Sequence, residues 1–287
     1  MNSLTAAVHA IMHEAAERAI LPRYRTLAKE QVTAKAADDV VTVADHESEA
    51  ILAELLSSLL PEAAIVGEEA AFSDAALFDR LGDALCWIVD PLDGTNNFAS
   101  GKPPFGVLVA LAEAGETIAG WIYDPLTGRF CHAERGKGAW IGDDRVQSRA
   151  SGEELPVAAI SLIFMDPARR AAARALLAPH YRLVDLPRCA AEQYPRIVLG
   201  QNDVFIFERT LPWDHAAGIL FLNEAGGKAA RPDGSPYRVA DHARPGLFGA
   251  ASPALWDELA ARMAALPARS VVLSPLAAVK DDGERGI

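Results

Sequence analysis

The chain has 287 residues, of which 51% are hydrophobic, and its formal net charge at neutral pH is −12. This length and hydrophobic content are enough to bury a large core, as one domain with two closely packed lobes or as two closely packed domains. The acidic balance argues against nucleic acid as a partner, because no run of Lys or Arg offsets the repulsion of its phosphates.

The N-terminal part predicts two helices with a strand between them. Residues 4–28 have the spacing of an amphipathic helix, residues 40–43 read as an apolar strand, and residues 45–59 as a second helix. Charged side chains such as Glu14 and Glu17 lie among the first apolar residues and exclude a signal peptide, and no later stretch is a long apolar span. We therefore expect a cytoplasmic protein that does not enter a membrane.

The middle of the chain is rich in predicted strands. One short apolar run closes on Glu68 and Glu69, and the next should stop at Pro91, because proline cannot donate a hydrogen bond to a sheet. Three further strands, separated by turn signals, are expected at residues 107–112, 118–123 and 129–133.

The last part alternates strands with helices. A strand is expected near residues 182–186, and helices at residues 167–177, 190–199, 214–224 and 253–266, the second of them kinked or shortened by Pro195. Mixed order of this kind predicts an α+β fold of layered helices and sheets.

The domain organisation follows from two polar segments. The stretch at residues 147–154 is the expected boundary between lobes of about residues 1–150 and 151–268, which together form a single catalytic domain. Residues 269–287 are a C-terminal extension whose charged end, 281–286, should be loose. The three cysteines, Cys86, Cys131 and Cys189, lack CxxC spacing and are expected to be buried, with a partly exposed thiol at Cys189 as the alternative.

Residues 87–98, Trp-Ile-Val-Asp-Pro-Leu-Asp-Gly-Thr-Asn-Asn-Phe, carry the strongest chemical signal. Asp90 ends the predicted strand, and Asp93 follows on a tight turn. These carboxylates, with the Thr95 hydroxyl and the Leu92 carbonyl, offer hard oxygen ligands that suit Mg²⁺, Mn²⁺ or Ca²⁺ better than zinc. On the Asp-Pro and Asp-Gly pairs alone, the alternative is an Asx-type turn with a solvated acid at each end.

Other segments supply matching acids where a strand ends or a helix begins: Asp45, Glu68 with Glu69, and Asp214. Each has an ordinary structural explanation. Glu68 and Glu69 fit the first turn of a helix, where the macrodipole favours acids, and Asp45 and Asp214 fit N-caps. Their occurrence together favours a metal site.

Three segments carry a family resemblance: Gly-Glu-Glu at 67–69, Trp-x-x-Asp-Pro-Leu-Asp-Gly-Thr-x-x-Phe at 87–98 and Trp-Asp-x-x-Ala-Gly at 213–218. In this order they resemble the inositol monophosphatase family of Mg²⁺-dependent phosphomonoesterases, over roughly residues 5–265. The resemblance implies a layered αβαβα sugar-phosphatase fold, a small phosphorylated substrate and a homodimer.

The resemblance also implies a metal centre of two or three Mg²⁺ ions, which Mn²⁺ or Ca²⁺ could replace. A first ion would activate the attacking water and would be held by Glu68, Asp90, the Leu92 carbonyl and Thr95. A second would stabilise the leaving oxygen and would be held by Asp90, Asp93 and Asp214.

The implied catalytic residues are Glu68, Thr95 and Asp45. The Thr95 hydroxyl, hydrogen-bonded to Asp45, would orient the water and pass on its proton. The main-chain N–H groups of Gly94 and Thr95 would cradle the phosphate. Lys35 falls where the family often has a lysine near the site, although an ordinary solvated lysine is the alternative.

The implied substrate-binding residues include Asp93 and Asp214, and others that depart from the family pattern. Where many members read Gly-[Ser/Thr]-Ala, this chain reads Arg-Cys-Ala, so Arg188 stands two residues before Ala190 in the expected pocket wall. Arg188 would either bind a second anionic group or cover a surface. Glu208 matches the family's acid for substrate hydroxyls, but its segment is one residue shorter than the common pattern, so an outward orientation is the alternative.

The expected function is Mg²⁺-dependent hydrolysis of a small sugar or polyol phosphate, with myo-inositol 1-phosphate as the default substrate. Histidinol phosphate, fructose 1,6-bisphosphate and 3′-phosphoadenosine 5′-phosphate are alternatives, the last disfavoured because Asn96-Asn97-Phe98 replaces Lys-[Glu/Asp]-Phe. An alternative of another class is a metal-binding regulatory scaffold, against which the complete set of ligands argues.

Overall fold

The computed structural model describes residues 1–36, 39–162 and 164–266. The C-terminal extension expected at 269–287, with its charged end, lies outside these residues. Within the described part of the chain, none of the helices has the length and apolar character needed to cross a membrane.

The first helix is shorter than predicted. α1 (Ser3–Ala15) runs into a π-helical turn (Ala16–Ile20) and a 3-10 turn (Leu21–Arg23), so helical structure ends five residues before residue 28. Pro22 is the physical reason, because it has no N–H and its ring clashes with the carbonyl four residues earlier. The guanidinium of Arg23 hydrogen-bonds that region instead, with Nη1 2.9 Å from the Ala19 carbonyl oxygen.

A hairpin and a second helix follow. β1 (Val32–Ala36) pairs antiparallel with β2 (Asp39–Thr42), and α2 covers Val43–Leu59. α2 begins two residues earlier than predicted because its N-cap is Thr42 and not Asp45. The Asp45 carboxylate lies in the first turn and accepts a hydrogen bond from the Thr42 N–H at 2.8 Å, which completes a capping box.

Seven strands form the larger sheet, in the order β3-β4-β5-β6-β7-β8-β9. β3 and β4 are parallel, and each later pair of neighbours is antiparallel. The strands are β3 (Ala64–Gly67), β4 (Cys86–Asp93), β5 (Gly106–Glu113), β6 (Glu116–Asp124), β7 (Arg129–Glu134), β8 (Gly138–Ile141) and β9 (Asp144–Val146). Short helices follow β3 and β4: α3 (Glu68–Ser73), a 3-10 helix (Ala75–Gly82) and α4 (Thr95–Ala99).

The end of β4 differs from the prediction. Its pairing with β5 continues to Asp90, shifts register, and resumes where Asp93 lies opposite Gly106. Pro91 falls in this irregularity, where its missing N–H removes no regular ladder bond. Gly94 then takes a φ of 84°, in the left-handed region, and turns the chain into α4.

Five strands form the smaller sheet, in the order β11-β10-β12-β14-β13. β11, β10 and β12 are parallel, and β14 and β13 complete the sheet antiparallel. The strands are β10 (Val157–Ile160), β11 (Arg182–Asp185), β12 (Val204–Phe207), β13 (Lys228–Ala230) and β14 (Leu247–Ala250). The helices of this part are α5 (Pro167–Leu177), α6 (Ala190–Val198), α7 (Pro212–Glu224), a 3-10 turn (Val239–Asp241) and α8 (Pro253–Met263).

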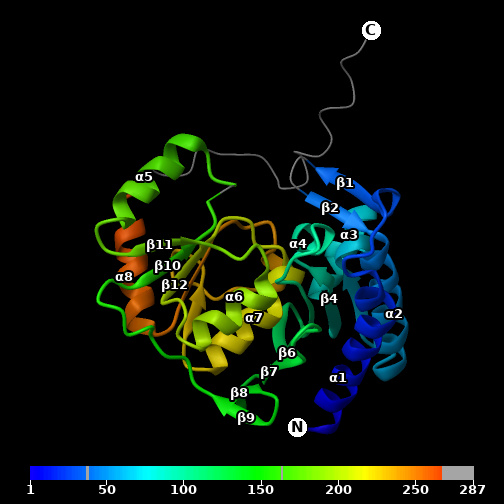
Figure 1. Ribbon diagram of the computed structural model, residues 1–287. Coiled ribbons are helices and arrows are strands. Elements are labelled where there is room, and N and C mark those ends of the chain that lie inside the picture. The colour runs from blue at the N-terminus through cyan, green and yellow to red at the C-terminus, as the bar shows by residue number, and fades with distance from the viewer. Residues whose placement is uncertain (37–38, 163, 267–287) are drawn as a thin grey trace.

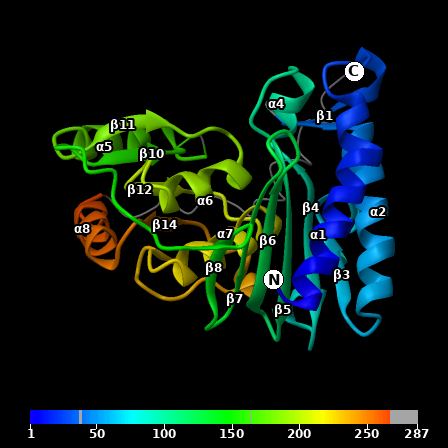
Figure 2. The same ribbon diagram turned by 60° about the horizontal axis from the view of Figure 1, so that its bottom comes forward.

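The elements stack as five layers, which confirms the predicted α+β class and the αβαβα order (Figures 1 and 2). α1 and α2 cover one face of the larger sheet, α6 and α7 lie between the two sheets, and α5 and α8 cover the far face of the smaller one. Three apolar clusters hold the layers together, and the one around α6 and α7 joins both sheets. Cys86, Cys131 and Cys189 are free thiols buried in the cluster between the sheets, as expected for all three.

Candidate metal centre and substrate cavity

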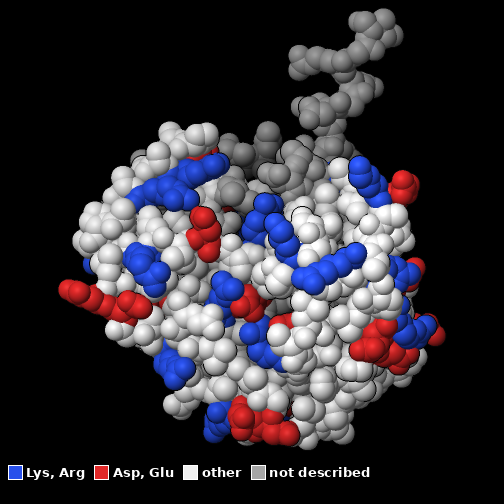
Figure 3. Space-filling model, viewed as in Figure 1, with Lys and Arg blue, Asp and Glu red and all other residues white. Residues whose placement is uncertain are grey.

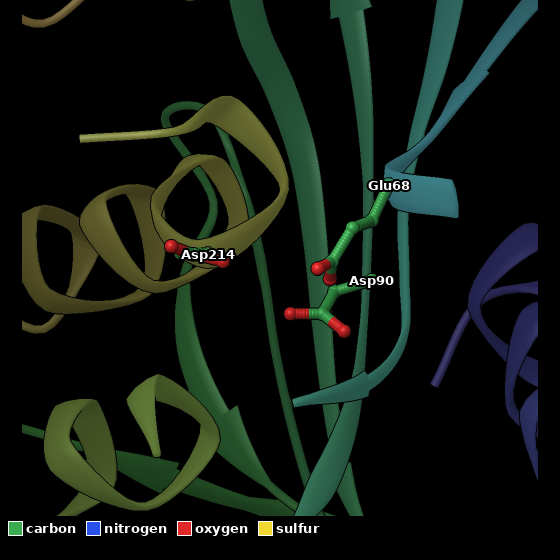
Figure 4. A group of neighbouring side chains, drawn as sticks. All are labelled: Glu68, Asp90 and Asp214. Carbon is green, nitrogen blue, oxygen red and sulfur yellow. The ribbon is translucent and has the colours of Figure 1, made fainter. Parts of the chain in front are cut away.

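Three carboxylates from separate elements meet at one edge of the larger sheet. Glu68 is the first residue of α3, Asp90 lies at the irregular end of β4, and Asp214 lies in the first turn of α7. Each offers an oxygen within 4.8 Å of the others. Figure 4 shows Glu68 and Asp90 side by side, with Asp214 on the facing turn of α7. The N-cap interpretation of Asp214 is wrong, because the cap is Leu211.

The electrostatics of this cluster favour a cation. Asp90 is 1% exposed, and burial raises its pKa well above the usual value, with the charges of Glu68, Asp93 and Asp214 raising it further. Carboxylates gathered in this way repel one another unless a proton or a cation lies among them. Their hard oxygen atoms suit a divalent cation such as Mg²⁺, so the residues present fit the metal that the sequence predicts.

Lys35 reaches this cluster from β1. Its Nζ lies 3.0 Å from Glu68 Oε1 and 2.6 Å from Glu69 Oε1. Burial lowers the pKa of Lys35, but the two glutamates outweigh burial, and its pKa lies above the usual value. Because one ammonium serves two carboxylates, burial and the charge of Glu68 raise the pKa of Glu69 to about 8 against the pull of Lys35. The solvated alternative for Lys35 is therefore wrong.

Glu49 of α2 holds the start of α3 in place. Its carboxylate accepts hydrogen bonds from the N–H groups of Glu69 and Ala70, both at 2.8 Å. Gly67 makes this possible, because a Cβ at that position would collide with the Glu49 carboxylate. The backbone that presents Glu68 is thus fixed from behind by a buried acid that the sequence interpretation missed.

Thr95 joins the metal cluster to α2. Its Oγ1 lies 3.0 Å from Asp45 Oδ1 and 2.9 Å from the carbonyl oxygen of Leu92. The single hydroxyl proton can serve one of these acceptors at a time. Burial raises the pKa of Asp45 to about 6, although hydrogen bonds from Thr42 oppose it. The expected pair of Thr95 and Asp45 is present, with Asp45 behind Thr95.

Asp93 faces the start of α6. Its Oδ2 accepts a hydrogen bond from the Ala191 N–H at 2.6 Å. Burial raises the pKa of Asp93 to about 6, which this bond opposes. Asp93 stands outside the group formed by Glu68, Asp90 and Asp214, although all four line the same cavity.

A cavity of about 400 Å³ opens beside the carboxylates. The predicted residues that line it are Glu68, Asp90, Leu92, Asp93, Gly94, Thr95, Arg188, Ala190, Glu208 and Asp214. Glu208 therefore contributes to the cavity wall, in spite of its shortened segment. The remaining lining residues are Asn96, Ser161, Phe164, Leu186, Cys189, Gln193, Phe207, Arg209 and His215. Figure 3 shows Lys and Arg side chains gathered over the middle of this face, between the sides that carry α5 and α4.

A buried polar chain that the sequence interpretation missed supports the far wall of the cavity. Tyr194 Oη lies 3.0 Å from His215 Nδ1, and His215 Nε2 lies 3.2 Å from the carbonyl oxygen of Arg209. Burial lowers the pKa of His215 to about 3, so the ring is neutral at physiological pH. A neutral ring with both nitrogens engaged fixes the main chain at Arg209 and carries no charge to the site.

Known proteins are similar to this chain in sequence and in structure. A sequence model of the inositol monophosphatase family matches residues 1–267. An inositol-1-monophosphatase of Caulobacter vibrioides is 35% identical over 216 residues, which is 73% of this chain and 82% of the relative. The Nus factor SuhB of Vibrio cholerae is 34% identical over 203 residues, 69% of this chain and 74% of the relative.

A solved structure shows the same fold. The crystal structure of the extragenic suppressor protein suhB from Bartonella henselae superimposes with a TM-score of 0.78 at 26% identity, covering 91% of this chain and 98% of that one.

Proposed function

The chain belongs to the inositol monophosphatase family and is a phosphoric monoester hydrolase, and from this premise we propose that it cleaves a small sugar or polyol phosphate with Mg²⁺ as its cofactor. The observation that carries the proposal is the meeting of Glu68, Asp90 and Asp214 at one end of the substrate cavity. The default substrate is myo-inositol 1-phosphate. We also propose a cytoplasmic homodimer whose single catalytic domain divides into lobes near residue 150.

The proposed ligands of a first ion are Glu68, Asp90, the Leu92 carbonyl and Thr95, and those of a second are Asp90, Asp93 and Asp214. Bound Mg²⁺ would make a coordinated water acidic and stabilise negative charge on the leaving oxygen. The protein supplies the rest of the site. Asp93 is held at the start of α6 by the Ala191 N–H, and Glu68 is held at the start of α3 by Glu49.

Thr95 is the proposed acceptor of the proton that the attacking water loses. The Thr95 hydroxyl lies 3.0 Å from Asp45 Oδ1 and would donate its hydrogen to that carboxylate. This would leave a lone pair of Thr95 Oγ1 to accept a hydrogen bond from the water. Asp45, whose pKa is about 6, can take the proton on from Thr95.

The phosphate is proposed to lie against the turn from β4 to α4. Gly94, with its φ of 84°, brings the main chain to the cavity wall without a side chain in the way. The N–H groups of Gly94 and Thr95 would donate to phosphate oxygens. Glu208 would accept hydrogen bonds from substrate hydroxyls, and Arg188 and Ala190 would contact the rest of the ester.

The experiment is phosphate release from a panel of esters, measured with Mg²⁺ and then with chelator. The panel contains myo-inositol 1-phosphate, histidinol phosphate, fructose 1,6-bisphosphate and 3′-phosphoadenosine 5′-phosphate. We expect turnover that requires Mg²⁺ and is lost with chelator. Equal rates with and without metal, or no release from any ester, would contradict the proposal.

A role in protein binding is the second candidate, favoured by the similarity to the Nus factor SuhB of Vibrio cholerae. In this case the chain would act as a metal-binding regulatory scaffold that works by binding a partner. The panel above separates the two, because a scaffold without catalysis releases no phosphate while its metal centre still binds Mg²⁺.

A further inference from the structure

Arg188 occupies an unusual backbone position in the cavity wall. Its φ is 53°, in the left-handed region that L side chains rarely adopt and glycine tolerates. The neighbouring chain is pinned on both sides. Asn97 Nδ2 donates to the carbonyl oxygen of Pro187 at 3.0 Å, and the Ala191 N–H donates to Asp93. A strained non-glycine residue held in this way at a site indicates that its side chain is used there.

Arg209 is the second cation of the same cavity. Its guanidinium carbon lies 4.6 Å from the ring centre of Phe164, and this exposed ring also lines the cavity. Its main-chain carbonyl accepts from His215, which the buried Tyr194 holds in turn. The backbone of Arg209 is therefore held by a buried hydrogen-bond chain, and its guanidinium group lies against the Phe164 ring in the cavity wall.

The charged residues that line the cavity fall into two groups. Of the acids that line the cavity among the described residues, Glu68, Asp90, Asp93 and Asp214 belong to the proposed metal centre, where two divalent cations would offset their four charges. Among the described lining residues, Arg188, Arg209 and Glu208 are the charged ones outside this group. Two guanidinium groups and one carboxylate therefore line the part of the cavity that the proposed metal centre does not occupy.

We propose that this cavity selects phosphate monoesters that carry a second anionic group, a phosphate or a carboxylate, and that Arg188 and Arg209 bind that group. The inference rests on the proposed function, because it concerns the substrate of the same site. Planar guanidinium groups bind either anion through paired N–H donors, which makes arginine suited to this role.

The experiment compares matched esters that differ by one anionic group, in the presence of Mg²⁺. The pairs are fructose 1-phosphate with fructose 1,6-bisphosphate, and glycerol 2-phosphate with 2-phosphoglycerate. We expect kcat/KM to be at least about tenfold higher for the doubly anionic member of at least one pair, which also distinguishes phosphate from carboxylate. The preference should weaken as salt is added.

Two variants test the assignment to residues. Arg188→Gly removes the side chain at a φ that glycine adopts without strain, and Arg209→Gln keeps most of the side-chain volume; each should reduce the preference at least about tenfold. Arg25→Gly is the matched control, because Arg25 is exposed, has a φ of 64° and lies outside the lining of the cavity. We expect this control to keep the preference.

The outcomes are distinct. Metal-dependent hydrolysis with no gain from the second anionic group would overturn the inference and leave the proposed function standing. A preference that survives both arginine variants would overturn the assignment to Arg188 and Arg209. No metal-dependent hydrolysis of any ester would overturn the proposed function and the inference together.

Discussion

At Asp93, a substitution is expected to reduce turnover without reducing the folding stability of the metal-free protein. Its carboxylate is held by the Ala191 N–H, and burial raises its pKa to about 6, so its charge is unfavourable without a cation nearby. In Asp93→Asn, the amide oxygen can keep the bond to Ala191 while the NH₂ group faces the cavity and cannot bind a cation. We expect kcat to fall at least about a hundredfold, with the thermal midpoint of the metal-free protein unchanged or raised.

Kinetics with Mg²⁺ and thermal unfolding with chelator measure these two effects separately. Asp143→Asn is the control. This carboxylate is exposed in the turn between β8 and β9, and it is not among the residues that line the cavity. It should change neither quantity. An Asp93→Asn protein that keeps most of its turnover would rule out the role proposed for Asp93 in binding the second ion.

For single residues, the sequence predicted those that belong to a recognisable motif. Glu68, Asp90 and Asp214 meet as expected from three segments far apart in the chain. It could not predict partners defined only by packing. Glu49 lies in the middle of a helix and gives no sign that it caps α3, and His215 adjoins Asp214 but acts on Arg209.

Among the elements, helix N-termini surround the site. α3, α4, α6 and α7 each place a first-turn residue in the lining of the cavity. The first N–H groups of a helix have no partner within the helix and carry partial positive charge, so these helix ends offset part of the repulsion among the carboxylates. Glu68 and Asp214 can therefore be both ordinary first-turn acids and metal ligands, because a position at the start of a helix suits both roles.

The contact between Gly67 and Glu49 provides a test of how an element is positioned. In Gly67→Ala, the new methyl group would push the Glu49 carboxylate away from the N–H groups of Glu69 and Ala70, which donate hydrogen bonds to it. Overpacking of this kind costs about 1–3 kcal/mol, and the displaced start of α3 should also weaken Mg²⁺ binding through Glu68. We expect a lower thermal midpoint and a higher Mg²⁺ concentration for half-maximal activity.

Gly82→Ala is the matched control for this change. Gly82 ends the 3-10 helix after α3, and a Cβ there meets nothing within 4 Å. Its midpoint and its Mg²⁺ requirement should stay at the wild-type values. If Gly67→Ala behaved in the same way, Glu49 would not be what holds α3.

Element boundaries were predicted less well than element types. The helices at α5, α6 and α8 lie close to their predicted ranges, and Pro195 is accommodated inside α6. The first helix ends early because its last turns depend on Pro22, and β4 passes Pro91 because β5 supplies a partner beyond it. The first difference follows from a proline inside the segment, whereas the second depends on a neighbouring strand that the local sequence does not reveal.

Across the whole molecule, the layered arrangement puts the acidic cluster where the larger sheet meets the helices between the two sheets (Figure 1). β4 of the larger sheet supplies Asp90, and α7, between the sheets, supplies Asp214. The order of strands and helices predicted the layers, because mixed α and β segments must cover each other's apolar faces. It could not predict the order of the smaller sheet, which depends on strands that are four residues long or shorter.

The stability of the whole molecule should depend on pH and Mg²⁺ together. Glu69, with a pKa of about 8, and Asp45 and Asp93, with pKa values of about 6, all lie above their unfolded values. Such groups bind more protons in the folded state, so they stabilise it below those unfolded values and lose that effect as pH rises through the folded pKa. Between pH 7 and 9 Glu69 loses its proton in the folded state, and above about pH 8 the buried thiols of Cys86, Cys131 and Cys189, whose pKa values burial raises, destabilise the folded protein in the same direction.

We therefore expect the metal-free protein to become less stable from pH 7 to pH 9, by up to about 1.4 kcal/mol per pH unit for each proton released. Each kcal/mol corresponds to roughly 2–4 °C in the thermal midpoint for a chain of 150–250 residues. Mg²⁺ should flatten this slope, because a cation at Glu68 replaces the proton that Glu69 would otherwise take up. Glu69→Gln should flatten it without metal. Two results would contradict this prediction: a thermal midpoint that rises between pH 7 and 9 in chelator, or a pH dependence of the midpoint that Glu69→Gln leaves unchanged. Either would show that the group formed by Lys35, Glu68 and Glu69 does not set the pH dependence of stability.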